Sequence, residues 1–150
     1  MRPYLTLALF IVVVLGGGTL IGVTTLPGGW YAGLIKPSFN PPNWVFAPAW
    51  TLLYLLIAIA GWRIWQRDSR SAAMTAWFIQ LGLNFVWSPV FFGAHRIGLA
   101  LAIIVALLAA ILSFIATAWP RDRVASWLFV PYAAWVTFAT ALNAAVWRLN

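Results

Sequence analysis

Aromatic side chains recur at helical spacing in this 150-residue chain, and they are the groups best suited to bind a flat ligand. Phe46, Trp50 and Tyr54 follow one another every four residues. A second stripe, with spacing i, i+3, i+4, i+7 and i+8, consists of Trp135, Phe138, Ala139, Leu142 and Asn143. Residues spaced in this way lie on one face of an α-helix. Such stripes are typical of a packed core, but they also suit a planar, apolar, conjugated ligand that stacks on indoles.

Neutral polar side chains lie among these aromatic residues. Gln80, Asn84 and Ser88 share one helical face, and Trp87 flanks it. An asparagine within an apolar helix needs a hydrogen-bond partner, either on another helix or on a ligand. Asn84 and Asn143 therefore either join helices or orient a ligand.

The charged residues exclude several other kinds of chemistry. Asp68 and Asp122 are the only acidic side chains, and both are expected in short loops beside arginines. Apart from Arg63 at the end of the second, no predicted span contains Asp, Glu, Lys or Arg, which argues against proton relays, ion-coupled pumps and paired-carboxylate catalysis. His95 is the only histidine and cysteine is absent, so no metal site is expected.

The composition indicates that the solvent of this protein is lipid. The chain is 64% hydrophobic and 7% charged, whereas soluble domains are about half apolar and a quarter charged. Its charge-free stretches are long enough for the roughly 20 apolar residues of a membrane-spanning helix. They predict five spans at about 4–26, 43–64, 72–94, 97–118 and 124–147. The predicted fold class is an all-α integral membrane protein, a five-helix transmembrane bundle in which residues 1–150 form one domain.

The first loop, residues 27–42, is rich in aromatic residues and prolines, so we expect an ordered lid.

With five spans, the N-terminal side carries six cations and the opposite side three, which are Lys36, Arg96 and Arg148. The positive-inside rule then places the N-terminus of this multi-pass protein inside, with a reversed or dual topology as the alternative. The net charge is +7, and we interpret the cationic residues as topology signals and lipid-headgroup contacts rather than as a nucleic-acid site. Tryptophans near the predicted span ends are typical of interfacial belts: Trp62, Trp65, Trp119, Trp127 and Trp147.

Three segments of the chain closely resemble the tryptophan-rich sensory protein/translocator protein (TspO) family. They are residues 30–54, which contain Trp-Tyr-Ala-Gly-Leu-Ile-Lys-Pro-Ser-Phe-Asn-Pro-Pro-Asn-Trp, residues 84–93 and residues 130–143. The resemblance implies a five-helix bundle, usually a homodimer, that binds porphyrins such as protoporphyrin IX as ligands rather than as covalent cofactors. It further implies roles in tetrapyrrole transport, in oxidative-stress sensing as a receptor, or in light-dependent porphyrin breakdown.

The same resemblance implies a set of ligand-binding residues. They are Trp30, Tyr31, Phe46, Trp50, Tyr54, Asn84, Trp87, Trp135, Ala139, Leu142 and Asn143. Trp50 and Trp135 match the tryptophans linked to porphyrin degradation, and they would be catalytic only in a porphyrin-degrading protein. Phe39 stands where many relatives have tryptophan. Ala144 and Ala145 replace the tyrosines of the animal sterol-recognition stretch, so sterol binding is not expected.

Three functional hypotheses follow. The first is a tetrapyrrole-binding membrane protein that acts in porphyrin transport or in oxidative-stress sensing and regulation. The second is a light- and oxygen-dependent porphyrin-degrading enzyme. The third is a structural or regulatory partner of another membrane complex. Transport and sensing remain alternatives, because a passive carrier needs no coupling-ion site.

Overall fold

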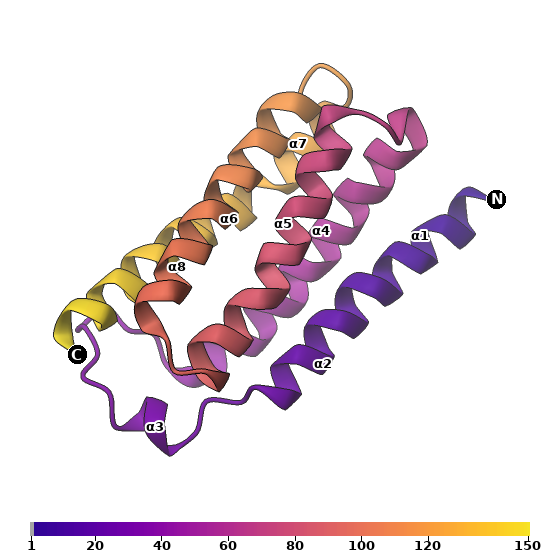
Figure 1. Cartoon of the computed structure of the whole chain (residues 1–150). Helices are drawn as coiled ribbons and strands as arrows, with labels where there is room; N and C mark the ends of the chain where they lie inside the picture. Colours follow the sequence, from indigo (N-terminus) through magenta and orange to yellow (C-terminus); the bar gives the residue numbers. More distant parts are fainter. Residues whose placement is uncertain (1) are drawn as a thin grey trace.

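Helices make up most of the chain, and the computed structural model describes residues 2–150 (Figure 1). No β-strand occurs in that range, so the predicted all-α class is confirmed. The helical elements in chain order are α1 (Pro3–Ile11), η1 (Val12–Gly16), α2 (Gly17–Thr24), α3 (Gly29–Ala32), η2 (Asn43–Val45), α4 (Phe46–Asp68), α5 (Ala72–Ser88), η3 (Pro89–Gly93), α6 (Ile97–Ala118), α7 (Arg123–Leu128) and α8 (Val130–Leu149).

Within residues 2–150, four continuous helical runs are long and apolar enough to cross a membrane. They are Pro3–Thr24, Asn43–Asp68, Ile97–Ala118 and Arg123–Leu149. The second run ends at Asp68 rather than near residue 64, so this aspartate closes a helix instead of lying in a loop. Its carboxylate accepts a hydrogen bond from the backbone N–H of Arg70, which helps to end α4 there.

The segment expected as the third span is divided into two helical forms. α5 has 17 residues and is followed directly by the five-residue π-helix η3. Pro89 has no backbone N–H and cannot continue the α-helical ladder, which explains the change at this position. The hydrogen bond from the Ala94 N–H to the Pro89 carbonyl, 2.8 Å long, has the i to i+5 spacing of a π-helix.

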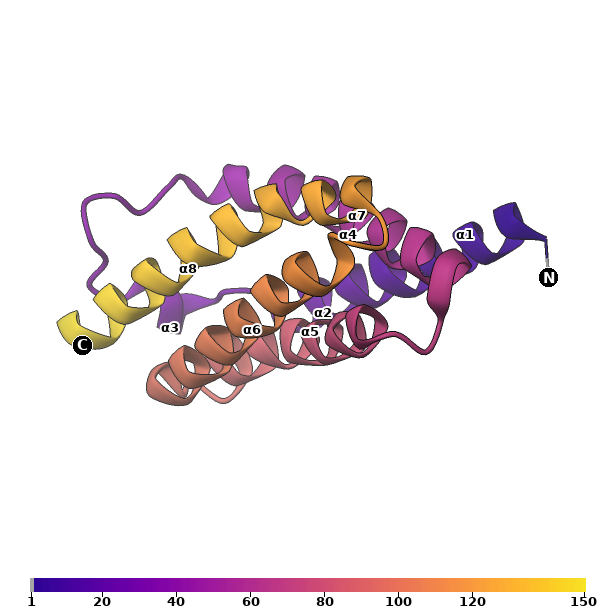
Figure 2. The same cartoon turned by 90° about the horizontal axis from the view of Figure 1, so that it is seen from above.

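The helices form a bundle in which sequential segments run antiparallel, with the two chain ends at opposite ends of the molecule (Figures 1 and 2). α1 packs on α4, α5 on α6, and α6 on α8, while the short α7 packs on α4. α4 and α8 make far less contact with each other than the helix pairs just named. The residues between α2 and α4, which include α3, cross the end of the bundle that holds the C-terminus.

Glycine allows two close approaches between helices. Gly61 on α4 lies against the indole of Trp77 on α5, and a β-carbon at Gly61 would overlap that ring. Trp77 is 2% exposed, and its Nε1 donates a 2.9 Å hydrogen bond to the Ile57 carbonyl. Gly18 on α2 is covered in the same way by the ring of Tyr54. Trp77 is therefore a core residue.

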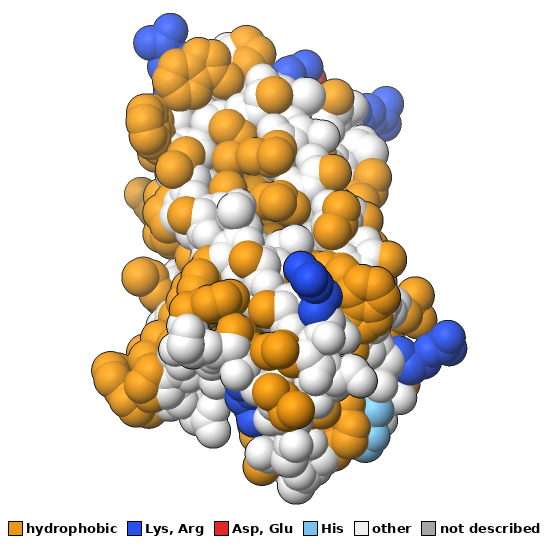
Figure 3. All heavy atoms as spheres, turned by 90° about the vertical axis from the view of Figure 1, so that its left-hand side faces the viewer, with side chains coloured by type: hydrophobic (Ala, Val, Ile, Leu, Met, Phe, Trp, Pro, Cys, Tyr) orange, Lys and Arg blue, Asp and Glu red, His pale blue; other side chains and the backbone are white. Residues whose placement is uncertain are grey.

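The outer surface is largely apolar, as expected for helices that face lipid. Figure 3 shows one face, on which hydrophobic side chains spread between cations at the top edge and cations in the lower half. Four of the five tryptophans expected at span ends are exposed, namely Trp65, Trp119, Trp127 and Trp147, and Trp62 is half-buried. Trp62 donates from Nε1 to the Pro3 carbonyl at 2.9 Å.

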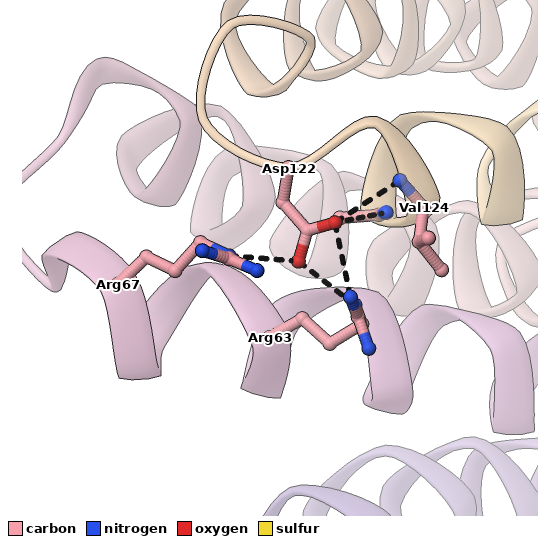
Figure 4. A network of polar contacts seen from close by, with 5 residues as sticks. Arg63, Arg67, Asp122 and Val124 are labelled. Atoms are coloured by element: carbon pink, nitrogen blue, oxygen red, sulfur yellow. Dashed lines mark hydrogen bonds and ion pairs between the residues drawn. The ribbon is translucent and has the colours of Figure 1, made fainter.

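Asp122 connects α4 to the turn between α6 and α7 (Figure 4). Its carboxylate accepts hydrogen bonds from Arg63 at 2.8 and 3.2 Å and from Arg67 at 3.0 Å. It also caps α7 by accepting from the backbone N–H groups of Val124 and Ala125. Burial acts to raise the pKa of Asp122, but the hydrogen bonds from both arginines outweigh it, so the pKa is lowered from its usual value.

We predict that Gly61→Ala destabilises the protein, because the added methyl group meets the Trp77 ring. Overpacking of this kind costs about 1–3 kcal/mol, more than the roughly 1 kcal/mol that alanine gains over glycine in a helix. Gly82→Ala on α5 is the matched control, since its β-carbon meets nothing within 4 Å. Thermal unfolding in detergent should give a lower midpoint for Gly61→Ala alone; equal midpoints would contradict the close packing.

We also predict that acid weakens the attachment of α7 to α4. Because the pKa of Asp122 is lowered on folding, its stabilisation is complete above about pH 4 and is lost as the pH falls through the lowered pKa. Asp122→Asn keeps a capping residue but removes the charge, so it should cost about 1–3 kcal/mol at neutral pH. Unfolding midpoints measured from pH 7 to pH 2 should fall less steeply for the variant, and parallel curves would refute this role.

Candidate functional site

Four aromatic side chains of α4 and α8 meet inside the bundle, and we call Phe46, Trp50, Tyr54 and Trp135 the inner aromatic group. The ring centroids of Phe46 and Trp135 are 6.0 Å apart, and those of Trp50 and Trp135 are 6.4 Å apart. Both pairs meet edge to face, at 78° and 87°, an arrangement that aromatic quadrupoles favour. Trp50 and Tyr54 are 5.5 Å apart on α4. The two stripes identified in the sequence therefore face each other.

Trp135 is the member of this group with a fully buried polar atom that has no partner in the described part of the chain. Its Nε1 is buried and has no hydrogen-bond partner among residues 2–150. Buried indole N–H groups usually find an acceptor. The inner aromatic group thus combines half-buried ring faces with one donor that an acceptor atom of a ligand can satisfy.

Asn84, expected to bond either another helix or a ligand, is bonded across the bundle. Its Nδ2 donates to the hydroxyl of Tyr132 on α8 at 2.7 Å, and that hydroxyl donates to Oε1 of Gln80 at 2.7 Å. All three side chains are buried, Gln80 and Tyr132 completely. Two residues of the polar face of α5, Gln80 and Asn84, therefore attach α8 to α5.

Trp87 and Asn143 form a second bridge. The Trp87 Nε1 donates to the Asn143 side-chain oxygen at 3.0 Å, and the Asn143 Nδ2 donates to the Ile97 carbonyl at 3.1 Å. This chain of bonds links α5, α8 and the start of α6. Trp87 also stacks on Phe91, with centroids 5.0 Å apart.

Trp30 and Tyr31, both on α3, pack on the end of the bundle. Tyr31 is buried, and its ring lies 5.3 Å from Phe92 and 6.2 Å from Phe91. Trp30 stacks on His95 at 4.1 Å with an 8° interplanar angle. His95 has a φ of 58°, the left-handed conformation, at the turn between η3 and α6. Burial raises the pKa of the Tyr31 hydroxyl, which keeps it neutral.

The first loop is attached to the bundle at two further points. The Asn150 side chain pairs with the Ile35 backbone, accepting from its N–H at 3.1 Å and donating to its carbonyl at 2.9 Å. Phe39 meets Phe138 of α8 edge to face, with centroids 6.0 Å apart. Phe39 therefore makes an aromatic contact between the loop and α8.

A hollow of about 540 Å³ lies within this loop rather than between the bundle helices. Its lining is Pro27, Gly28, Tyr31, Ala32, Lys36, Asn40, Pro41, Pro42 and Asn43. The Lys36 ammonium lies 4.5 Å from the centroid of the Tyr31 ring and donates to the Leu34 carbonyl at 3.3 Å. Of the expected ligand-binding residues, only Tyr31 lines the hollow.

Apart from the two asparagines, the expected ligand-binding residues belong to two adjoining aromatic cores. One contains Trp50, Tyr54, Trp135 and Ala139, and the other contains Trp30, Tyr31, Phe46 and Leu142. Trp87 packs against both. Across residues 2–150 the structure brings together no group of three His, Asp or Glu side chains that could hold a metal ion. The arrangement is suited to stacking and hydrogen bonding.

Tyr132 is the residue that sequence reasoning missed. It is fully buried, bonds Asn84 and Gln80, and has its ring 6.4 Å from that of Trp50. It lies three residues before Trp135, so it shares the face of the α8 stripe. That spacing is the signal by which it could have been found.

Comparison with known proteins agrees with these features. The model of the TspO/MBR family matches residues 9–148. "Protein CrtK" of Rhodobacter capsulatus is 37% identical over 145 residues, covering 94% of this chain and 89% of that protein. "Tryptophan-rich protein TspO" of Archaeoglobus fulgidus is 47% identical over 125 residues, covering 81% and 80%. "Translocator protein" of Sus scrofa is 38% identical over 156 residues, covering 99% and 92%.

The family match extends over nearly the whole chain and includes the first loop, the α4 stripe and the α8 stripe. Together with several helices apolar enough to span a membrane, it makes this chain a multi-pass integral membrane protein. The chain belongs to the TspO/MBR family, whose members include proteins named translocator protein and tryptophan-rich sensory protein.

Proposed function

We propose that this protein binds a tetrapyrrole such as protoporphyrin IX and acts in porphyrin transport or in oxidative-stress sensing. The observation that carries the proposal is the inner aromatic group, with the unpartnered Nε1 of Trp135 buried within it. A flat conjugated macrocycle offers faces for the indole rings and acceptor atoms for that N–H. The family resemblance of the sequence implies the same ligand.

Five membrane spans are part of this proposal, with α5 and η3 together as the third. Their 17 and five residues amount to about 33 Å at 1.5 Å per residue, enough for a hydrocarbon core of about 30 Å. We propose that the end of the bundle near the N-terminus faces inside, because six of the nine cations belong to it. We also propose a homodimer, as the family resemblance implies.

The first loop is proposed to act as a lid over the ligand. Tyr31, Ile35 and Phe39 attach it to three different places on the bundle, so its closed position is defined by several small contacts. Lys36 supplies a cation within the loop, which suits the acidic substituents of a porphyrin. Such a lid would exclude water from the stacked macrocycle.

Titration of protoporphyrin IX into the detergent-solubilised protein should quench tryptophan fluorescence saturably. Trp135→Leu removes one aromatic contact and the free N–H, so we expect roughly 10-fold weaker binding, the effect of losing about 1.4 kcal/mol. Trp127→Leu is the matched control, because this exposed tryptophan lies at the opposite end of the bundle. Quenching no stronger than inner-filter effects, or the same loss in both variants, would count against a specific site.

The edge-to-face contact of Trp50 and Trp135 favours light-dependent porphyrin breakdown as a second candidate function. A porphyrin held against these oxidisable indoles should be converted to an open-chain product under light and oxygen. Trp135→Phe should slow the spectral change, with Trp127→Phe as control. A bleaching rate equal to that of free porphyrin in micelles would exclude this activity.

A further inference from the structure

Two arginines at the N-terminal end of the bundle are held in place by one carboxylate and keep unused donors. Arg63 bonds Asp122 through Nε and Nη2, whereas Arg67 bonds it through Nε alone (Figure 4). Within the part of the chain that the structure describes, neither Nη atom of Arg67 has a hydrogen-bond acceptor. The Arg67 side chain is 53% exposed, so these donors are open to the surroundings.

The carboxylate cannot neutralise this cluster. Asp122 is shared by two guanidinium groups, and its side chain is only 3% exposed, so the trio presents a net positive charge outward. Arg121 and Arg123 flank Asp122 in the sequence and are both exposed. A guanidinium with two parallel N–H donors fits a phosphate group, and its attachment to Asp122 reduces the entropy lost on binding.

The surroundings of the cluster are those of a membrane interface. The Arg123 guanidinium lies 4.9 Å from the ring of Trp119, whose centroid is 6.3 Å from that of Trp127. Both indoles are exposed, Trp127 by 61%. Exposed tryptophans next to cations are typical of the headgroup level of a bilayer, where the ring meets acyl chains and the cation meets phosphate.

We propose that this end of the protein is a binding site for an anionic phospholipid, whose phosphate is held by Arg63 and Arg67 with Arg123 beside them. Asp122 is a positioning residue that fixes the two guanidinium groups, and Trp119 and Trp127 contact the glycerol and upper acyl region. The apolar outer surface of the neighbouring helices favours a lipid over a soluble phosphate compound. This site is separate from the inner aromatic group, so the proposal of lipid binding does not depend on porphyrin binding.

Native mass spectrometry of the protein with phosphatidylglycerol and with phosphatidylcholine of the same acyl chains tests this site. We expect tighter binding of phosphatidylglycerol and about 5-fold weaker binding after Arg67→Gln, the factor that one interfacial cation contributes. Arg67→Lys retains the charge but not the Nη donors, so it should also lose affinity. Arg148→Gln, at the other end of the bundle, is the control with the same charge change and should bind normally.

Three results would overturn the proposal. Equal binding of the two lipids, or equal loss in Arg67→Gln and Arg148→Gln, would indicate unspecific attraction. Full affinity in Arg67→Lys would show that the guanidinium geometry is not used. The site would belong to a soluble anion if inorganic phosphate displaced phosphatidylglycerol and stabilised the lipid-free protein as much as phosphatidylglycerol does. If Arg67 variants fail to fold, Arg123→Gln decides, because Arg123 is not a partner of Asp122 and its loss should also cost about 5-fold.

Discussion

The need to satisfy polar side chains inside an apolar bundle determines how its helices are arranged. Tyr132 on α8 bonds both Gln80 and Asn84 on α5, and Trp87 and Asn143 extend the connection to α6. Lipid offers no alternative partners, so each of these groups must be bonded within the protein. These bonds fix the rotation of α8 about its own axis, and with it the direction in which its aromatic stripe faces.

The position of the inner aromatic group follows from that rotation. With Tyr132 and Asn143 turned toward α5 and α6, Trp135 is turned toward α4 and meets Phe46 and Trp50. Within residues 2–150 its N–H is buried without an acceptor, and so is the side-chain nitrogen of Gln80, whose oxygen accepts from Tyr132. Unpartnered buried donors are uncommon in protein cores.

The two ends of the bundle differ in how they are held together. At the N-terminal end, Asp122 joins α4 to α7 by charged hydrogen bonds, which are strong and directional. At the other end, the first loop is attached by aromatic contacts and by the pairing of Asn150 with Ile35, each of them individually weak. The cationic end is therefore held by charged hydrogen bonds, and the loop end by several weaker contacts.

The sequence by itself determined where the helices lie and which residues share a face. Charge-free runs and periods of three and four residues are local properties, so the α4 and α8 stripes and the first loop could be predicted from them. Only the tertiary structure decided which partner each polar group takes. Asn84 bonds Tyr132 on another helix, and Asp122 bonds Arg63 and Arg67 rather than its neighbours Arg121 and Arg123. These partners lie about fifty residues apart in the chain, and the choice among them depends on how separate helices pack, which no local pattern specifies.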